Sequence, residues 1–185
     1  MPDIILASAS PRRREILDLM GVIYTVIPAK AELPMDLSLS IEQAVLNVAR
    51  GKAEEVAAAH PDAVVIGADT IVVVDDTVLG KPKNENDAKA MLRRLSDRTH
   101  RVMTAVWIAH GDKSEGFVDA AEVTFMPMTD AEIDAYVATT EPNDKAGAYA
   151  IQGKGMRYIR GINGDFYTVM GLPSGRLYDT LKKHI

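Results

Sequence analysis

A continuous apolar run at residues 63–68, AVVIGA, constrains the fold of this chain more than any other segment. A strand has this composition when both faces of its sheet are covered. Helices on both faces of a sheet are characteristic of α/β proteins. We therefore expect strands and helices to alternate along the chain.

The hydrophobic periodicity agrees with this expectation. Strands are predicted at residues 3–7, 22–27, 63–68, 71–74, 77–79, 99–109 and 113–125. Helices are predicted at residues 11–20, 40–59, 87–95, 129–138 and 174–183, and short strands mixed with turns at 147–171. Two of the helices begin with capping-box patterns, Ser40 with Gln43 and Thr129 with Glu132. The order predicts an α/β fold with a mixed sheet, in one domain over residues 1–185 with a smaller lobe near residues 70 to 140.

Composition excludes several classes of protein. No apolar run approaches the roughly 20 residues that span a bilayer, and the N-terminus passes directly into Ser8 and three arginines, unlike a signal peptide. The absence of cysteine removes disulfides and thiolate chemistry and favours a cytoplasmic location. A net charge of -5 and a single tryptophan argue against a nucleic-acid module, which usually carries a basic stripe.

Positive charge is concentrated at Arg12 to Arg14, which follow Ser10 and Pro11 where a predicted strand passes into a helix. Ser10 suits the N-cap and Pro11 the first helical position. Cations are unfavourable at this end, because the helix dipole is positive there, unless an anion offsets them. Backbone N–H groups, serine hydroxyls and guanidinium groups together form a phosphate site. The alternative is a solvated helix face paired with Glu15 and Asp18.

Lys52 interrupts the apolar stripe of the helix predicted at residues 40–59. It falls at the i, i+4, i+7 spacing on the face of Val45, Val48 and Val56. A lysine there is costly to bury without a partner. Either its ammonium group reaches solvent past the stripe, or this face borders a cleft where Lys52 meets a phosphate or a carboxylate.

Asp69 and Thr70 follow the apolar run, and Lys81 stands a little downstream between Gly80 and Pro82. A carboxylate just after a buried strand is a common place for a metal ligand or general base in α/β enzymes. The alternative is a turn aspartate that caps its own backbone. One aspartate, two lysines and an arginine cluster suit phosphoryl chemistry, in which cations neutralise developing charge and a carboxylate holds Mg²⁺ or orients water.

Other familiar sites are absent from the sequence. No G-x-x-x-x-G-K-[ST] loop occurs, so the chain is not a P-loop NTPase. The four histidines show no metal-ligand spacing, and Ser174 does not lie in a G-x-S-x-G elbow. Magnesium with oxygen ligands is therefore favoured over zinc.

These segments resemble the Maf family of nucleotide pyrophosphatases, also called septum-formation inhibitor proteins, over nearly the whole chain. The motifs that carry the resemblance are Leu6-Ala7-Ser8-Ala9-Ser10-Pro11-Arg12-Arg13, Gly67-Ala68-Asp69-Thr70, Gly80-Lys81-Pro82, Leu95-Ser96, Thr99-His100, Asp144-Lys145-Ala146-Gly147, Tyr149-Ala150-Ile151-Gln152-Gly153 and Gly171-Leu172-Pro173. The resemblance implies an elongated mixed β-sheet flanked by helices, two lobes around a central cleft, similarity to inosine triphosphate pyrophosphatases, and a homodimer.

The resemblance also implies the parts of a site. The triphosphate would be held by Ser8, Arg13, Lys52 and Lys81. Asp69 would act as general base or as a metal-linked activator of water, and Glu32 would help to bind a divalent cation, Mg²⁺ or else Mn²⁺ or Co²⁺. Two departures from the family pattern are present: Ala29-Lys30-Ala31 precedes Glu32 where the family often has another acid, and Asp97-Arg98 replaces Ser-Gly.

The substrate follows from the subgroup that the chain resembles. Gln152, with Arg12 and Thr70, would select the base. Thr70, the Thr99-His100 pair and Gln152 resemble the type that splits dTTP and UTP to the monophosphate and pyrophosphate, and modified pyrimidine nucleotides are candidate substrates of the same type. A neutral amide both donates to and accepts from a pyrimidine edge. The 7-methyl-GTP type tends to carry glutamate at that position, and a structural hydrogen bond is the alternative for Gln152.

Three other functions use the same residues. A phosphomonoesterase would release inorganic phosphate from the same cationic site. A non-catalytic nucleotide sensor could regulate septum formation, although a carboxylate near phosphates gains it nothing without a metal. A nucleic-acid module built on the arginines conflicts with the net charge. A house-cleaning enzyme of nucleotide metabolism, acting without nucleic acid or membrane, is the function that the sequence favours.

Overall fold

The computed structural model describes residues 2–30 and 33–185, and these residues form a mixed α/β fold. The strands are β1 (Ile4–Leu6), β2 (Thr25–Val26), β3 (Val64–Val74), β4 (Thr77–Leu79), β5 (Thr99–His110), β6 (Lys113–Phe125) and β7 (Ile159–Asn163). The helices are α1 (Pro11–Leu19), α2 (Ile41–Ala57), α3 (Glu85–Leu95), α4 (Asp130–Val137), α5 (Phe166–Met170) and α6 (Ser174–Leu181), with 3₁₀ turns at Glu141–Asp144, Ala146–Ala148 and Lys154–Tyr158.

The described strands form one mixed sheet in the order β2-β1-β3-β5-β6-β7, with β4 also paired to β3. β1 is parallel to β2 and to β3, whereas β4 is antiparallel to β3 and β7 is antiparallel to β6. The predicted α/β class and mixed sheet flanked by helices are confirmed. The predicted cleft between two lobes stays a prediction.

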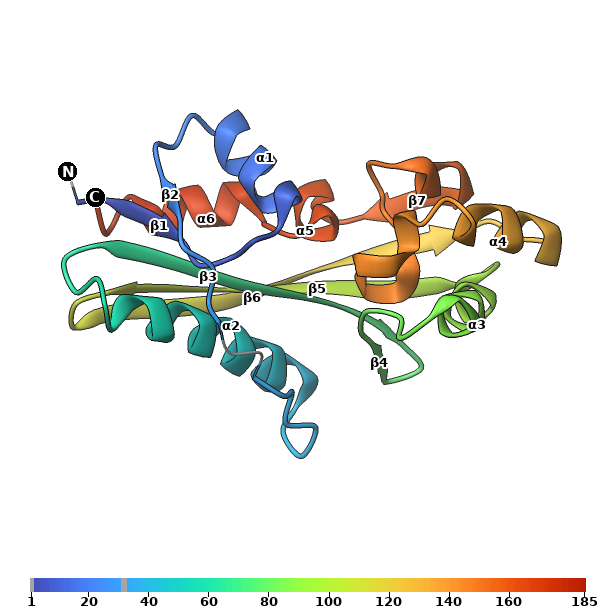
Figure 1. Cartoon of the computed structure of the whole chain (residues 1–185), viewed down its shortest axis with the longest axis horizontal. Coiled ribbons are helices and arrows are strands. Elements are labelled where there is room, and N and C mark those ends of the chain that lie inside the picture. The colour runs from blue at the N-terminus through green and yellow to red at the C-terminus, as the bar shows by residue number, and fades with distance from the viewer. Residues whose placement is uncertain (1, 31–32) are drawn as a thin grey trace. The chain divides into compact units, whose positions relative to one another are not determined.

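The chain divides into two compact units. The first comprises Met1–Thr70, Thr104–Asp119 and Gly171–Ile185, and the second comprises Ile71–Met103 and Ala120–Met170. Within the first unit, α2 covers one face of the sheet, and α1 and α6 lie on the other (Figure 1). Ala53 and Val56 of α2 pack with Ile5, Val65 and Ala109 in a buried core. Burial on both faces is what the apolar run required.

The second unit has its own core. Leu92 and Leu95 of α3, Ile133 of α4 and Phe125 of β6 are fully buried in it, and Tyr149 packs against them. Both helices begin with side-chain caps, which satisfy free N–H groups of the first turn. Asn84 accepts from the amide of Asp87 at α3, and Thr129 with Glu132 forms the predicted capping box at α4.

The structure corrects several predicted boundaries. β3 runs without interruption through Asp69 and Thr70, which were expected just after the strand. These polar residues can lie within the strand because side chains from two helices form hydrogen bonds with them. β2 has two residues rather than six, because only Thr25 and Val26 pair with β1. At α2, Ser40 accepts from the Gln43 amide, but only this half of the capping box forms. Helix α5 was not predicted.

Candidate functional site

Asp69 and Thr70, adjacent residues of β3, contact different helices. Successive side chains of a strand point to opposite faces of its sheet. Asp69 Oδ1 lies 2.6 Å from Lys52 Nζ on α2, and Thr70 Oγ1 accepts from Arg13 Nη2 of α1 at 3.1 Å. The helices lie on opposite sides of the strand (Figure 1). Two consecutive residues of one strand in the first unit therefore contact Lys52 on one face of the sheet and Arg13 on the other.

Gly67 explains how α2 comes close enough to β3 for the Lys52–Asp69 pair. It stands two residues before Asp69 and so faces the same helix. A Cβ at Gly67 would lie 2.7 Å from the amide nitrogen of Ala53 and would also overlap the carbonyl oxygen of Ala49. Only glycine permits this approach of helix and strand backbones.

Lys52 and Asp69 are shielded but still accessible, with side-chain exposures of 20% and 21%. Lys52 does not simply reach solvent past the apolar stripe, because it is paired with a carboxylate. Lys52 donates a hydrogen bond to Oδ1 of Asp69, and the described residues donate none to Oδ2. The pair therefore presents both a positive group and an available carboxylate oxygen to a ligand.

Arg13 is buried and held by three oxygen atoms. Its Nε donates to the carbonyl of Gly171 at 2.9 Å, and its Nη1 and Nη2 donate to Ser8 Oγ and Thr70 Oγ1 at 2.9 and 3.1 Å. Burial lowers the pKa of Arg13 from 12.5 to about 10; the charge of Asp69 acts in the opposite direction, and that of Arg12 adds to the lowering. All three acceptors are neutral, so among the residues that the structure describes the buried cation has no directly bonded anion. Such a site favours binding of an anionic ligand.

The first turn of α1 adds hydrogen-bond donors beside Arg13. Ser10 is the N-cap and Pro11 the first helical residue, as predicted, but the Ser10 side chain makes no capping hydrogen bond. Ser8 Oγ instead accepts from the Ser10 amide at 3.3 Å. The amides of a first helical turn lack partners within the helix, and with the positive end of the dipole they suit phosphate. Among the described residues, no ion pair joins these arginines to Glu15 or Asp18.

The remaining predicted residues are less constrained. Arg12 is half-buried beside Arg13 in the first unit. Lys81 and Gln152 are exposed in the second unit, and the described residues provide no hydrogen-bond partner for either side chain. The Gly147 amide donates to the carbonyl of Gly80, which fixes the backbone beside Lys81. Glu32 lies outside the described residues.

Sequence reasoning missed three residues that organise these groups. Thr104 is fully buried, and its Oγ1 lies 3.0 Å from Thr70 Oγ1, while Gly171 supplies the carbonyl for Arg13. In the second unit, Glu141 accepts from the amides of Lys154 and Gly155. Gly171 belonged to a quoted motif, but nothing local indicated the partners of Thr104 or Glu141.

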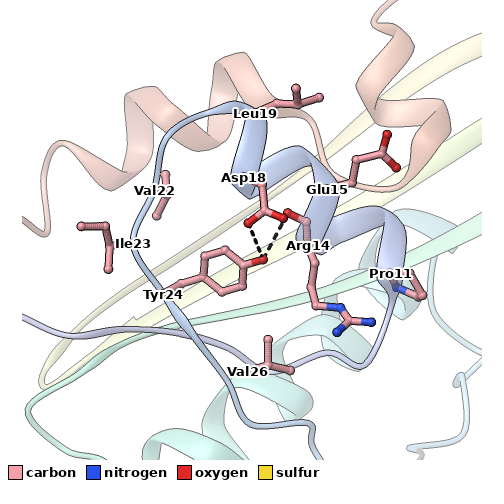
Figure 2. Close-up of a pocket in the computed structure, with 9 residues that line it drawn as sticks. All are labelled: Pro11, Arg14, Glu15, Asp18, Leu19, Val22, Ile23, Tyr24 and Val26. Carbon is pink, nitrogen blue, oxygen red and sulfur yellow. Dashed lines mark hydrogen bonds between the residues drawn. The ribbon is translucent and has the colours of Figure 1, made fainter.

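A surface pocket of about 830 Å³ lies between α1 and the segment that leads into β2. Arg14, Asp18, Ile23 and Tyr24 are among its lining residues (Figure 2). The Tyr24 hydroxyl donates to Asp18 Oδ1 and to the Arg14 carbonyl. None of the predicted site residues lines this pocket, and its charged groups are of mixed sign, an arrangement that does not favour a phosphate.

The side chains present fit a cation that the protein coordinates only in part, with a bound substrate supplying the other ligands. Among the described residues, no three His, Asp or Glu side chains are placed to hold a metal ion by themselves. Mg²⁺ commonly takes one or two carboxylates and completes its shell with phosphate oxygens and water. Oδ2 of Asp69 suits that mode of binding.

None of the described helices has the length and apolarity to cross a membrane.

The model of a family described as Maf-like protein matches residues 3–184. The chain belongs to the Maf family. The resemblance noted in the sequence is thereby confirmed, and the Ser8–Arg13 segment, Asp69 and Lys81 all lie within the matched range.

Two curated Maf relatives match almost end to end. A protein of Bacillus velezensis (strain DSM 23117 / BGSC 10A6 / LMG 26770 / FZB42), named dTTP/UTP pyrophosphatase, is 49% identical over 180 residues, 97% of this chain and 95% of the relative. A protein of Bacillus cereus (strain AH820) with the same name is 49% identical over 183 residues, 99% of this chain and 96% of the relative.

A solved structure supports the fold. The Staphylococcus aureus Ham1 protein aligns with a TM-score of 0.52 at 15% identity, covering 99% of this chain and all of that protein. At this identity the likeness concerns the fold alone.

Proposed function

We propose that this Maf protein hydrolyses dTTP and UTP, and also modified pyrimidine nucleotides, to a nucleoside monophosphate and pyrophosphate. The observation that carries the proposal is the pair of adjacent residues on β3, Asp69 bonded to Lys52 and Thr70 bonded to the buried Arg13. The names of two relatives that are 49% identical to this chain support the substrate.

The first unit would bind the triphosphate through Arg13, Ser8 and the amides of α1. Arg13 already donates to three neutral oxygens, which fix the plane of its guanidinium group. A preorganised cation gains affinity because little side-chain freedom is lost on binding. Thr70 is bonded to both Arg13 and Thr104, so we assign it to holding Arg13 rather than to direct contact with the base.

Asp69 would orient the attacking water and accept its proton. The water oxygen forms a bond to the α-phosphorus, the bond from that phosphorus to the α–β bridging oxygen breaks, and the electron pair leaves with pyrophosphate. Lys52 and Lys81 would stabilise negative charge on the phosphate oxygens. Asp69 and Glu32 would hold a divalent cation, Mg²⁺ or else Mn²⁺ or Co²⁺, which supplies neutralisation of phosphate charge when bound.

Gln152 would recognise the base, together with Arg12. The amide of Gln152 is exposed and has no partner among the described residues, so it is available to donate to and accept from a pyrimidine edge. A homodimer, which the family resemblance implies, and a cytoplasmic location, which the absence of cysteine favours, are parts of the same proposal.

A product assay tests the proposed function. The purified protein is incubated with dTTP, UTP, CTP, GTP and 7-methyl-GTP, each with Mg²⁺, Mn²⁺ or Co²⁺, and pyrophosphate and orthophosphate are measured separately. We expect equal amounts of monophosphate and pyrophosphate, with dTTP and UTP as the fastest substrates. Release of orthophosphate alone would identify a phosphomonoesterase, and binding without turnover would identify a sensor.

A further inference from the structure

The loop that carries Gln152 is fixed at both ends by two side chains of the second unit. At its beginning, the amide of Ala150 donates to the hydroxyl of Tyr136 at 3.1 Å. At its end, the amides of Lys154 and Gly155 donate to the carboxylate of Glu141 at 2.9 and 3.0 Å. Gln152 lies between these anchors.

Glu141 and Tyr136 are themselves joined, so the two anchors form one unit. The Tyr136 hydroxyl donates to Glu141 Oε2 at 2.6 Å. Burial alone would raise the pKa of Glu141, but hydrogen bonds from Tyr136 and the two amides outweigh it and lower that pKa. The carboxylate is therefore ionised, and hydrogen bonds to a charged group are among the stronger ones in proteins.

The loop is built around the carboxylate at close quarters. A Cβ at Gly153 would overlap the Glu141 carboxylate, and a Cβ at Gly155 would lie 2.7 Å from both the Tyr136 hydroxyl and the Ala150 carbonyl oxygen. Larger residues at either glycine would displace the anchors. The backbone on both sides of Gln152 is thus specified by contacts with Glu141 and Tyr136.

We infer that Glu141, with Tyr136, is a positioning residue that sets nucleobase selectivity by holding the Gln152 loop in place. The inference rests on the proposed function of Gln152. Recognition of a base edge requires the amide to be placed within about 0.5 Å. Gln152 makes no hydrogen bond of its own with the described residues, so its backbone anchors provide this precision.

The test compares UTP with CTP, which differ at the edge that an amide would read. The variants are Glu141→Gln and Tyr136→Phe. In Glu141→Gln, an NH₂ group faces at least one of the two backbone N–H groups, so that hydrogen bond is lost. In Tyr136→Phe, the hydrogen bond between residues 136 and 141 is lost. Values of kcat/KM are measured for both nucleotides from pyrophosphate release. Their ratio does not depend on the fraction of folded protein, so loss of stability alone leaves it unchanged.

Glu132→Gln is the matched control. It makes the same chemical change in the same unit, at the capping box of α4, where the carboxylate accepts from the Thr129 amide and hydroxyl. This variant should lower the thermal midpoint while retaining the wild-type ratio.

We expect Glu141→Gln to reduce the UTP/CTP ratio of kcat/KM about tenfold, the factor that corresponds to loss of one hydrogen bond to a charged group. Tyr136→Phe should change the ratio in the same direction and provides the answer if Glu141→Gln fails to fold. An unchanged ratio in the folded variants would overturn the inference while leaving the proposed function intact. A wild-type protein that releases no pyrophosphate would overturn both.

Discussion

The ammonium nitrogen of Lys52 on α2 lies 2.6 Å from Oδ1 of Asp69 on β3. The pair leaves Oδ2 without a hydrogen bond from the described residues, in a position where both side chains remain about one-fifth exposed. A carboxylate with an available oxygen, held by a neighbouring lysine, is suited to bind a metal or to orient water.

Asp69→Asn tests this assignment. The amide oxygen can still accept from Lys52, so we expect the fold to persist. Loss of the base should reduce kcat for UTP at least about 100-fold, the lower range for general base catalysis. Glu54→Gln, an exposed carboxylate on α2 that pairs with Arg50, is the control and should retain activity. Near wild-type pyrophosphate release by Asp69→Asn would refute the role of Asp69.

Gly67→Ala tests the close approach of α2 to β3. The new Cβ would push against Ala49 and Ala53 and move the helix that carries Lys52. We expect a loss of about 1 to 3 kcal/mol in the free energy of unfolding, the usual cost of overpacking, and reduced kcat in the fraction that remains folded. Gly175→Ala is the control, because nothing lies within 4 Å of a Cβ there. Urea unfolding and kinetics provide the readouts, and wild-type values for Gly67→Ala would contradict this account.

Arg13→Lys tests the buried guanidinium group. An ammonium group cannot bond in the same plane to Ser8 Oγ, Thr70 Oγ1 and the Gly171 carbonyl. We expect KM for UTP to rise at least about tenfold, as for loss of a hydrogen bond to a charged group, with a lower thermal midpoint. Arg14→Lys on the exposed side of α1 should change neither quantity appreciably. If both variants bind UTP equally well, Arg13 does not hold the triphosphate.

His100 predicts a pH dependence of stability in the second unit. It is 2% exposed, and its Nε2 lies 2.7 Å from the Tyr149 hydroxyl. Burial lowers the pKa of His100 from 6.5 to about 4. Between these values the unfolded chain binds more protons, so stability should fall as the pH drops below about 6.5.

His100→Gln should reduce that dependence, since glutamine can still bond to Tyr149 but does not titrate. The measurement is the free energy of urea unfolding at pH 5 and pH 7.5, with His60→Gln in the other unit as a control that keeps the wild-type difference. Equal pH dependence in wild type and His100→Gln would show that this histidine is not responsible.

Local patterns predicted the elements well but could not predict their partners. The apolar run, the Thr129 capping box and the strand predicted at residues 77–79 depend on neighbours in sequence, and they form as expected. The stripe position of Lys52 indicated an unusual environment, but only the fold shows that Asp69 is its partner. Gly67 stood in the sequence only as part of the motif Gly67-Ala68-Asp69-Thr70, and nothing in that motif indicates that its lack of a side chain lets the helix approach the strand.

The hydrogen bonds that hold the Gln152 loop could not be predicted either, because they join residues that are far apart in the sequence. Glu141 resembles any surface glutamate in the sequence, and its function depends on amides 13 and 14 residues away. Thr104 contacts Thr70 across 34 residues. Contacts over such distances follow from how strands and turns assemble, and no periodicity records them.

In the proposed reaction, water attacks the α-phosphorus of a pyrimidine triphosphate bound at Arg13, Lys52 and Asp69. Hydrolysis of UTP in ¹⁸O-labelled water, followed by mass spectrometry of both products, tests it most directly. The account predicts one labelled oxygen in UMP and none in pyrophosphate. Label in pyrophosphate, or orthophosphate as the released product, would contradict it.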